Sequence, residues 1–301
     1  MSAPTYTSTT RPLDAIAAAL VVVLCLSWGV NQVAAKFAIH EIPPLTQAAV
    51  RSLAAALLIA AWCRLRGIAL FARDGTLWYG IAAGVLFAIE FILIYQGLLY
   101  TTATRAILFI YLAPFFVVLG ARVLLPADRF KLAQWLGLGL SFVGMLIAFG
   151  VPMPALDPRQ LTGDVMMVIA ALFWAATTLI IKATPLTRAS AEKIMLYQLV
   201  ISGPIMAAAA IVAGERMISL PSAMALGSLV YQTVWVVSVT YVVWFALIAR
   251  FSASRLSAFT FLTPLFGVGA GHVLLGEPLT PAFAAAVVMV AAGLVLVNRS
   301  R

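Results

Sequence analysis

Charged residues are scarce in this chain. Asp, Glu, Lys and Arg together make up 10% of its 301 residues, whereas soluble domains carry about 25%. The mean hydropathy is +1.08, so too few polar residues remain to cover the outside of a water-soluble fold. The scarcity excludes a soluble domain and indicates an integral membrane protein surrounded by the lipid bilayer.

Residues for metal, redox or covalent chemistry are also few. The chain contains two His and two Cys, and Cys25 and Cys63 lack the spacing of a metal site. It has no phosphate-binding glycine loop and no nucleophile elbow, so we expect no enzymatic activity, no cofactor and no ATP hydrolysis of its own. The net charge of +9 is ascribed to the basic loops of a membrane protein and not to a nucleic-acid partner.

Long apolar runs are what the sequence has instead. A helix needs about 20 apolar residues to cross roughly 30 Å of hydrocarbon, and continuous runs favour helices over a β-barrel. We predict an all-α membrane protein with ten transmembrane helices, over residues 14–37, 45–63, 76–98, 102–125, 131–150, 163–183, 190–213, 222–248, 253–275 and 281–298. The connections are short, so no soluble domain is expected between them.

The basic residues predict the orientation of these spans. Of the 19 Lys and Arg residues, five fall on one side or at helix ends there, which leaves 14 for the side that holds both termini. The five are Lys36, Arg51, Arg105, Arg159 and Arg216. Cytoplasmic segments of membrane proteins are enriched in Lys and Arg, so we expect both termini in the cytoplasm.

Two stretches of the first half recur in the second half. LSWGVNQVAAK at 26–36 matches LFWAATTLIIK at 172–182 in its Leu, Trp and Lys. YLAPFFVVLGARVLL at 111–125 matches FLTPLFGVGAGHVLL at 261–275, and both contain L-x-P-x-F-x-V-x4-V-L-L. We interpret the chain as two five-helix repeats, 1–150 and 151–301, forming one transport domain. Because five is odd, the second repeat crosses the membrane in inverted topology, an arrangement typical of secondary transporters.

These features resemble a known group of transporters. Ten spans, the five-plus-five repeat, W-x7-K in the first helix of each half and the closing LTPLFGVGAGHVLLGEPLT…AAGLVLV look like the drug/metabolite transporter superfamily. Within it the chain is most similar to EamA-type exporters of the bacterial aromatic amino-acid exporter group. The first half departs from the closing pattern, with Pro126-Ala127-Asp128 where the second has Gly276-Glu277-Pro278. The resemblance implies export of a small metabolite by alternating access.

Polar residues at matching places in the two halves are the first candidates for a binding site. Trp28, Asn31 and Gln32 lie on one face of the first span, and Trp174, Thr177 and Thr178 repeat that face in the sixth. Such residues also form hydrogen bonds between packed helices, worth about 1 kcal/mol each. Cavity lining and helix packing therefore both remain open for these six.

Glu90 lies near the middle of the third span. A carboxylate at that depth costs a few kcal/mol on insertion scales, so it should face a partner or water. It is a candidate proton site or a partner for the amino group of a substrate. The alternative is a structural ion pair with Arg51 or Arg105.

Further candidates come from aromatic and proline residues. The eighth span is aromatic and polar for its depth, and Tyr231 and Trp235 on one of its faces are candidates for stacking on a planar substrate; core packing and an aromatic belt are the alternative. Tyr95, Tyr111 and Gln198 are weaker candidates. Pro114 and Pro264 interrupt helix hydrogen bonding in equivalent spans, either as gating elements or as static kinks.

Together these observations predict a multi-pass exporter of the bacterial inner membrane. The expected substrates are small neutral amino acids, aromatic ones and others such as threonine and methionine, bound in a midplane cavity lined by spans one, three, four and six to nine. The alternative is export of drugs or other small metabolites on the same fold. Protons are a candidate coupling ion.

Overall fold

The computed structural model describes residues 13–39, 41–70, 72, 74–125, 128, 130–150, 157–217, 219–275 and 279–299. The prediction of ten spans is confirmed, because ten helices of this part of the chain are long and apolar enough to cross a membrane. The helices are α1 (Ala15–Ile39), α2 (Pro44–Leu65), α3 (Leu77–Gly97), α4 (Ala103–Ile110), α5 (Ala113–Leu124), α6 (Leu132–Phe149), α7 (Pro158–Ala183), η2 (Pro185–Arg188), α8 (Ala191–Val212), α9 (Ala223–Val230), η3 (Tyr231–Thr240), α10 (Tyr241–Arg250), α11 (Ala253–Phe259), α12 (Leu262–Leu275) and α13 (Pro281–Arg299). Both chain ends, the side chain of Lys36, Pro126-Ala127 and Gly276-Glu277-Pro278 lie outside the described residues.

The helices begin at residues that suit a helix N-terminus. The side chains of Asp157, Ser190, Ser222 and Ser252 precede α7, α8, α9 and α11, and each accepts a hydrogen bond from a backbone N–H in the first turn. Helix α2 begins with Pro44, whose missing N–H would have no partner in the first turn. Polar and proline residues between the apolar runs therefore determine where the spans start.

Two of the ten spans are interrupted. The fourth consists of α4 and α5, which separate at Tyr111 and Leu112, and the ninth consists of α11 and α12, which separate at Thr260 and Phe261. Pro114 and Pro264 follow these breaks, and neither can donate a hydrogen bond to the carbonyl four residues earlier. Each helix therefore ends about one turn before its proline, so the kinks expected at Pro114 and Pro264 are full interruptions of the helix.

The eighth span is continuous but changes its winding. Between α9 and α10, the ten residues of η3 form a π-helix, in which hydrogen bonds close five residues back instead of four. The hydroxyl of Ser238 follows the same spacing and donates to the carbonyl of Thr233 at 2.8 Å. The wider turn rotates the side chains of η3 relative to their positions in an α-helix.

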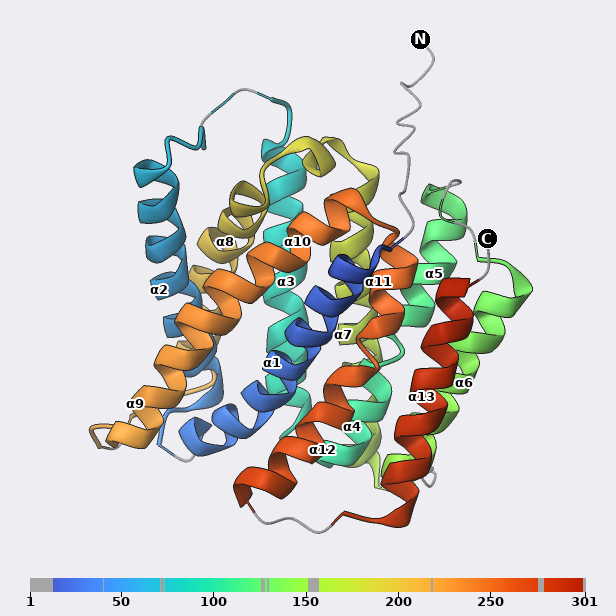
Figure 1. Ribbon diagram of the computed structural model, residues 1–301. Coiled ribbons are helices and arrows are strands. Elements are labelled where there is room, and N and C mark those ends of the chain that lie inside the picture. Colours follow the sequence, from blue (N-terminus) through green and yellow to red (C-terminus); the bar gives the residue numbers. More distant parts are fainter. Residues whose placement is uncertain are drawn as a thin grey trace.

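Helices from the two halves pack against one another across the molecule (Figure 1). At one edge α6 lies along α13, and at the other α2 packs on α8. Between them α3 packs on α7 and α8, α1 on α12, and α5 on α7. In Figure 1, α1 begins and α13 ends near the upper face, which we call the N-terminal face. The opposite face, where α1 ends, we call the far face.

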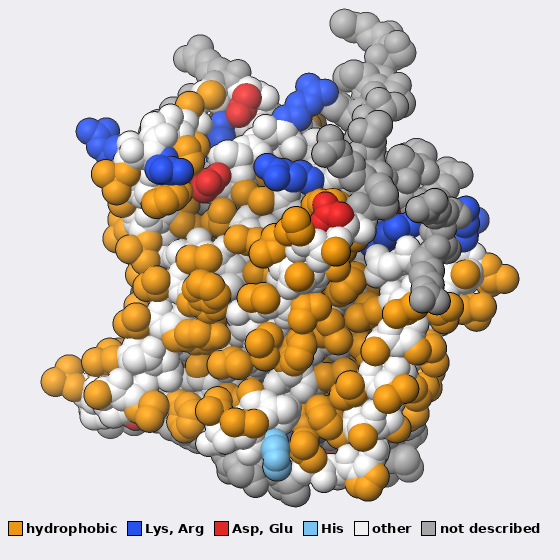
Figure 2. All heavy atoms as spheres, in the orientation of Figure 1, with side chains coloured by type: hydrophobic (Ala, Val, Ile, Leu, Met, Phe, Trp, Pro, Cys, Tyr) orange, Lys and Arg blue, Asp and Glu red, His pale blue; other side chains and the backbone are white. Residues whose placement is uncertain are grey.

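Charged side chains gather near the faces and leave a wide apolar belt. Figure 2 shows most Lys, Arg, Asp and Glu side chains along the upper edge, above a surface covered by hydrophobic residues.

Carboxylate side chains in the loops also hold neighbouring segments together through hydrogen bonds and an ion pair. Glu215 accepts hydrogen bonds from the backbone N–H groups of Leu45 (2.9 Å) and Thr46 (2.7 Å) at the start of α2. At the N-terminal face, Lys193 donates to Asp74 at 2.8 Å, and this contact lowers the pKa of Asp74 to about 2.

The packing of α6 on α13 depends on small residues. A methyl group added at Gly137 would lie 2.5 Å from the carbonyl oxygen of Gly293 and 2.9 Å from Cβ of Leu296, whereas one added at Gly139 would meet nothing within 4 Å. In lipid, such close backbone contact is a main source of helix association.

We expect Gly137→Ala to lower the melting temperature of the purified protein, because overpacking costs about 1–3 kcal/mol and exceeds the roughly 1 kcal/mol that Ala gains in a helix. Gly139→Ala, two residues away on the same helix, is the matched control and should leave the melting temperature unchanged or raise it. Equal melting temperatures for the two variants would contradict close packing at Gly137.

Candidate functional site

A cavity of about 580 Å³ lies between the two halves of the chain. Residues of α1, α2, α3, α4, α6, α7, α8, α10 and α12 line it. The lining extends from Trp244 and Phe245, which are buried, to Ile39 and Leu98, which are partly exposed at helix ends on the far face. Cavities of 300–1,000 Å³ are typical of small-molecule sites.

The cavity brings together most of the residues predicted from the sequence. Trp28, Asn31, Gln32, Glu90, Tyr95, Tyr111, Trp174, Thr177, Thr178, Gln198 and Pro264 all line it. They come from five helices and the break before α5, so the chain must fold completely before they meet. That these residues bind a substrate remains a prediction.

The two polar pairs of the repeat are used differently. Thr177 and Thr178 donate their hydroxyl protons to carbonyls of their own helix, at Phe173 (3.0 Å) and Trp174 (3.1 Å). The side-chain amide of Gln32 lies against α12, where Gly267 leaves room for it: a methyl group there would be 2.7 Å from Oε1 of Gln32. Oδ1 of Asn31 is buried and has no hydrogen-bond partner among the described residues, so this amide retains bonding capacity toward the cavity.

The two repeated tryptophans each have aromatic neighbours. The Trp28 ring meets Tyr241 and Trp244 edge-on, with centroids 5.7 and 5.3 Å away, and its N–H donates to Oγ1 of Thr240 at 2.9 Å. The Trp174 ring meets Tyr111 at 5.8 Å. Edge-to-face pairs of this kind hold ring orientations and leave ring faces available for stacking.

Tyr231 and Trp235 are not among the described residues that line the cavity, which corrects their expected position. The Tyr231 hydroxyl donates to the carbonyl of Ser27, and the Trp235 N–H donates to the Ser27 hydroxyl, both at 3.0 Å. Trp235 is 42% exposed. This face of η3 packs on α1, and α10 supplies the cavity-lining residues of the eighth span. Pro114 is buried at the start of α5.

The two arginines that were considered as partners for Glu90 have different surroundings in the structure. Arg105 forms a two-pronged contact with Asp164 of α7, in which Nε lies 3.0 Å from Oδ1, and Thr101 donates to the same carboxylate at 2.6 Å. Arg51 shares the cavity with Glu90. Among the described residues, however, no ion pair joins Glu90 to either arginine, so the structural ion pair considered for Glu90 is not formed.

Several lining residues escaped the prediction. Arg51 of the second span and Phe149 of the fifth belong to spans that were not expected to contribute. Trp244 was not among the candidates, yet it lines the cavity, is 5% exposed and packs on Trp28. The sequence did contain a signal for Arg51, because a lone cation inside an apolar run needs an explanation.

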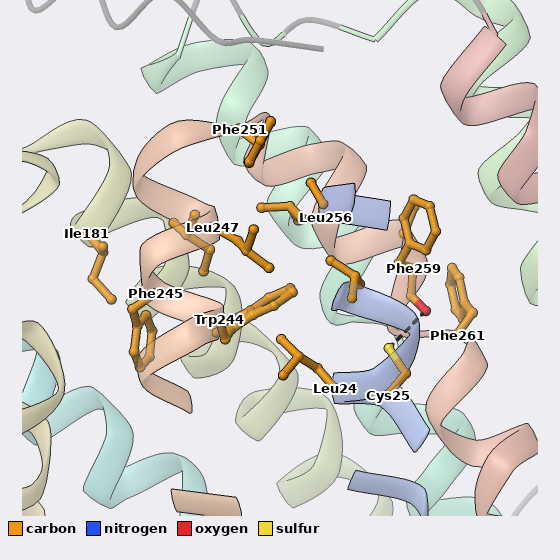
Figure 3. Packing of buried hydrophobic residues seen from close by; sticks show 14 of the residues in the cluster. Leu24, Cys25, Ile181, Trp244, Phe245, Leu247, Phe251, Leu256, Phe259 and Phe261 are labelled. Carbon is orange, nitrogen blue, oxygen red and sulfur yellow. Dashed lines mark hydrogen bonds between the residues drawn. The ribbon is translucent and has the colours of Figure 1, made fainter. Parts of the chain in front are cut away.

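The cavity is closed toward the N-terminal face. Beyond Trp244 and Phe245, the side chains of Leu247, Ile181 and Leu24 form part of a buried apolar cluster between α10, α7 and α1 (Figure 3). The same view shows the Cys25 thiol, 3.4 Å from the carbonyl oxygen of Phe259.

Polar contacts hold the end of α10 and the start of α11 in place next to this cluster. Nζ of Lys182 donates to the carbonyls of Ile248 (2.8 Å) and Ala249 (3.1 Å). Asp128 accepts hydrogen bonds from Ser252 and from the N–H of Ser254. Burial raises the pKa of this carboxyl above its ordinary value.

These features define a membrane protein of ten helical spans with an internal cavity that reaches one face, the arrangement of a small-molecule transporter. The model of the EamA-like transporter family matches residues 15–150 and 161–299. The chain belongs to the EamA-like transporter family.

Individual relatives agree with this assignment. The chain is 27% identical to the "Probable amino-acid metabolite efflux pump" of Salmonella typhimurium over 295 residues, covering 93% of each chain. It is 26% identical to an "Uncharacterized transporter" of Archaeoglobus fulgidus over 251 residues, 82% of this chain and 85% of that one. A solved crystal structure has the same fold, with a TM-score of 0.80 at 17% identity, over 94% of this chain and 96% of the other.

The one-sided cavity can be tested by thiol labelling. In protein whose own Cys25 and Cys63 are replaced by Ala, we expect a hydrophilic methanethiosulfonate to react with Val268→Cys, which lines the cavity, and to spare Ile248→Cys, which is fully buried in the cluster. Both positions are apolar helix residues, so each is a control for the other. Equal labelling of the two, followed by mass spectrometry, would show that the cluster does not close the cavity.

Proposed function

We propose that this protein exports small neutral amino acids, aromatic ones and others such as threonine and methionine, by alternating access of the central cavity. The observation that carries the proposal is a cavity of small-molecule size whose wall combines aromatic rings with amide, hydroxyl and charged groups. The relative from Salmonella typhimurium, named as an amino-acid metabolite efflux pump, supports this substrate class.

We further propose that the two halves are inverted repeats of one transport domain. The helix breaks support this, because Tyr111 and Phe261 occupy matching positions in the aligned segments. The packing supports it as well: α1 on α12 has its counterpart in α7 on α5, and α6 pairs with α13, the last helix of each half. Rocking of such halves around a shared cavity is the mechanism that this architecture uses elsewhere.

The direction of transport follows from the proposed orientation. The N-terminal face carries the basic loop residues Arg64, Arg66, Lys131 and Arg188, so we assign it to the cytoplasm of a bacterial inner membrane. The described state then has its cavity open to the outside and closed toward the cytoplasm. The apolar share of the wall also suits drugs or other small metabolites, which are the second candidate substrates.

Flux measurements test the substrate class. We expect proteoliposomes with the purified protein to take up labelled phenylalanine or threonine above empty vesicles. Trp174→Ala should reduce phenylalanine flux about fivefold, since one aromatic contact is worth about 1 kcal/mol. Trp235→Ala, which removes an indole outside the cavity, should change it less than about twofold. No flux of any amino acid above empty vesicles would overturn the proposal.

Proton coupling through Glu90 is a separate proposal. Glu90 is 7% exposed, and the other charged or titratable groups that line its cavity are Arg51, Tyr95, Tyr111 and Tyr241. We expect an imposed pH gradient to change amino-acid flux in the wild type. Glu90→Gln should remove that response while counterflow of labelled phenylalanine at equal pH continues. A response that persists in Glu90→Gln assigns the coupling to another group.

A further inference from the structure

Arg51 stands out among the residues of the cavity wall. It is 2% exposed about two turns into α2, and its guanidinium carbon lies 4.6 Å from the centroid of the Phe91 ring on α3. This contact over the ring holds the guanidinium plane in position. Within the described part of the chain, Nε and Nη2 of Arg51 have no hydrogen-bond partner. Buried donors of a charged group are rarely left unpaired, so acceptors from outside the chain, such as a ligand, an ion or water, are expected at them.

Arg105 shows what the same two nitrogens do when a carboxylate is available. There Nε and Nη2 contact both oxygens of Asp164 side by side. A guanidinium and a carboxylate match in this geometry because both are planar and present two parallel bonds. Arg51 has the same nitrogens unused at the wall of a cavity, so the acceptor that fits there is a carboxylate brought by another molecule.

The surroundings of Arg51 indicate the rest of that molecule. Glu90, next to Phe91 on α3, supplies the opposite charge in the same cavity. Gln198 is fully buried at the wall; its Nε2 donates to the carbonyl of Ile194 at 3.3 Å, and Oε1 has no partner in the described part of the chain. The rings of Phe87, Phe91 and Tyr95 follow one another along α3, with centroids 4.7 and 6.2 Å apart. The site thus combines a cation, an acid and an aromatic wall.

We propose that Arg51 is the carboxylate-binding residue of the cavity and that its substrates carry a free carboxylate beside an apolar or aromatic group. This assignment rests on the exporter function proposed above and narrows it, because drugs and metabolites without a carboxylate are then poor substrates. Glu90 faces the amino group of a zwitterion. A carboxylic acid that lacks the amine satisfies Arg51 only, and binds more weakly than the amino acid.

Binding of labelled phenylalanine to the purified full-length protein, with three unlabelled competitors, tests the assignment. The competitors are phenylalanine, phenylalaninamide, which lacks the carboxylate, and 3-phenylpropionate, which lacks the amine. We expect the amide to compete at least about tenfold more weakly than phenylalanine, the effect of losing a charged hydrogen-bonded pair. In Arg51→Gln, affinity for phenylalanine should fall about tenfold while that for the amide changes less than about twofold. Arg51→Lys keeps the charge without the two-pronged geometry, so its affinity for phenylalanine should lie between those of the wild type and Arg51→Gln.

Arg159→Gln, which removes an exposed arginine of α7, is the matched control and should bind as the wild type does. Equal competition by phenylalanine and its amide in the wild type overturns the assignment even where Arg51→Gln does not fold. An equal loss of affinity for phenylalanine and for its amide in Arg51→Gln also overturns the assignment. If proteoliposomes transport phenylalanine but binding does not discriminate against the amide, the proposed role of Arg51 is wrong and the exporter function stands. If binding discriminates against the amide but no flux is measured, the role of Arg51 stands and the exporter function is wrong. Absence of both overturns both proposals.

Discussion

The absence of water from the bilayer core is the constraint on which the rest of this structure depends. Backbone groups in hydrocarbon must find partners within the protein, so irregular backbone is tolerated only where protein or a cavity surrounds it. The breaks at Tyr111–Leu112 and Thr260–Phe261 and the π-helix η3 are the main irregularities of the described spans. Tyr111 lines the cavity, as does Thr263, two residues after the second break. The two breaks thus lie where the chain builds a site, whereas η3 contributes no residue to the described lining.

Polar groups at the faces and in the cavity differ in how well they are satisfied. At the faces, Glu215 and Asp128 each accept several hydrogen bonds from neighbouring segments. At the cavity, Asn31, Arg51 and Gln198 keep buried atoms without partners in the described chain. An unmade buried bond costs about 1–3 kcal/mol, so each such atom calls for an explanation. Buried atoms without partners in the described chain also occur outside the cavity, at Gln47, Ser52, Ser202, Gln232 and Asn298. The unpaired atoms at the cavity therefore indicate a ligand only together with their place in its wall.

The spans were predictable from the sequence, and part of the site was not, for physical reasons. Span length follows from the thickness of hydrocarbon, so apolar runs located all ten helices to within a few residues. The pairing of Trp28 with Trp174 placed both at the cavity correctly, since the repeated segments contribute the same face. Tyr231 and Trp235 share one face as expected, but this face packs on Ser27 of α1 and not on the cavity. A sequence shows which residues share a helix face and does not show what that face contacts. Arg51 was considered only as a partner for Glu90, because a sequence does not show whether two opposite charges form an ion pair in the folded protein.

Closure of the cavity toward the N-terminal face uses two kinds of contact that respond differently to movement. The aliphatic and aromatic cluster around Trp244 and Leu247 has no directional bonds, so its members can slide and repack at small cost. The hydrogen bonds from Lys182 to the carbonyls of Ile248 and Ala249 are directional and end abruptly when α10 moves. In lipid the hydrophobic effect does not drive helices together, so these bonds contribute more to holding α10 on α7 than the extent of apolar contact suggests. Opening of this face under the proposed mechanism therefore requires both the release of the Lys182 hydrogen bonds and the repacking of the apolar cluster.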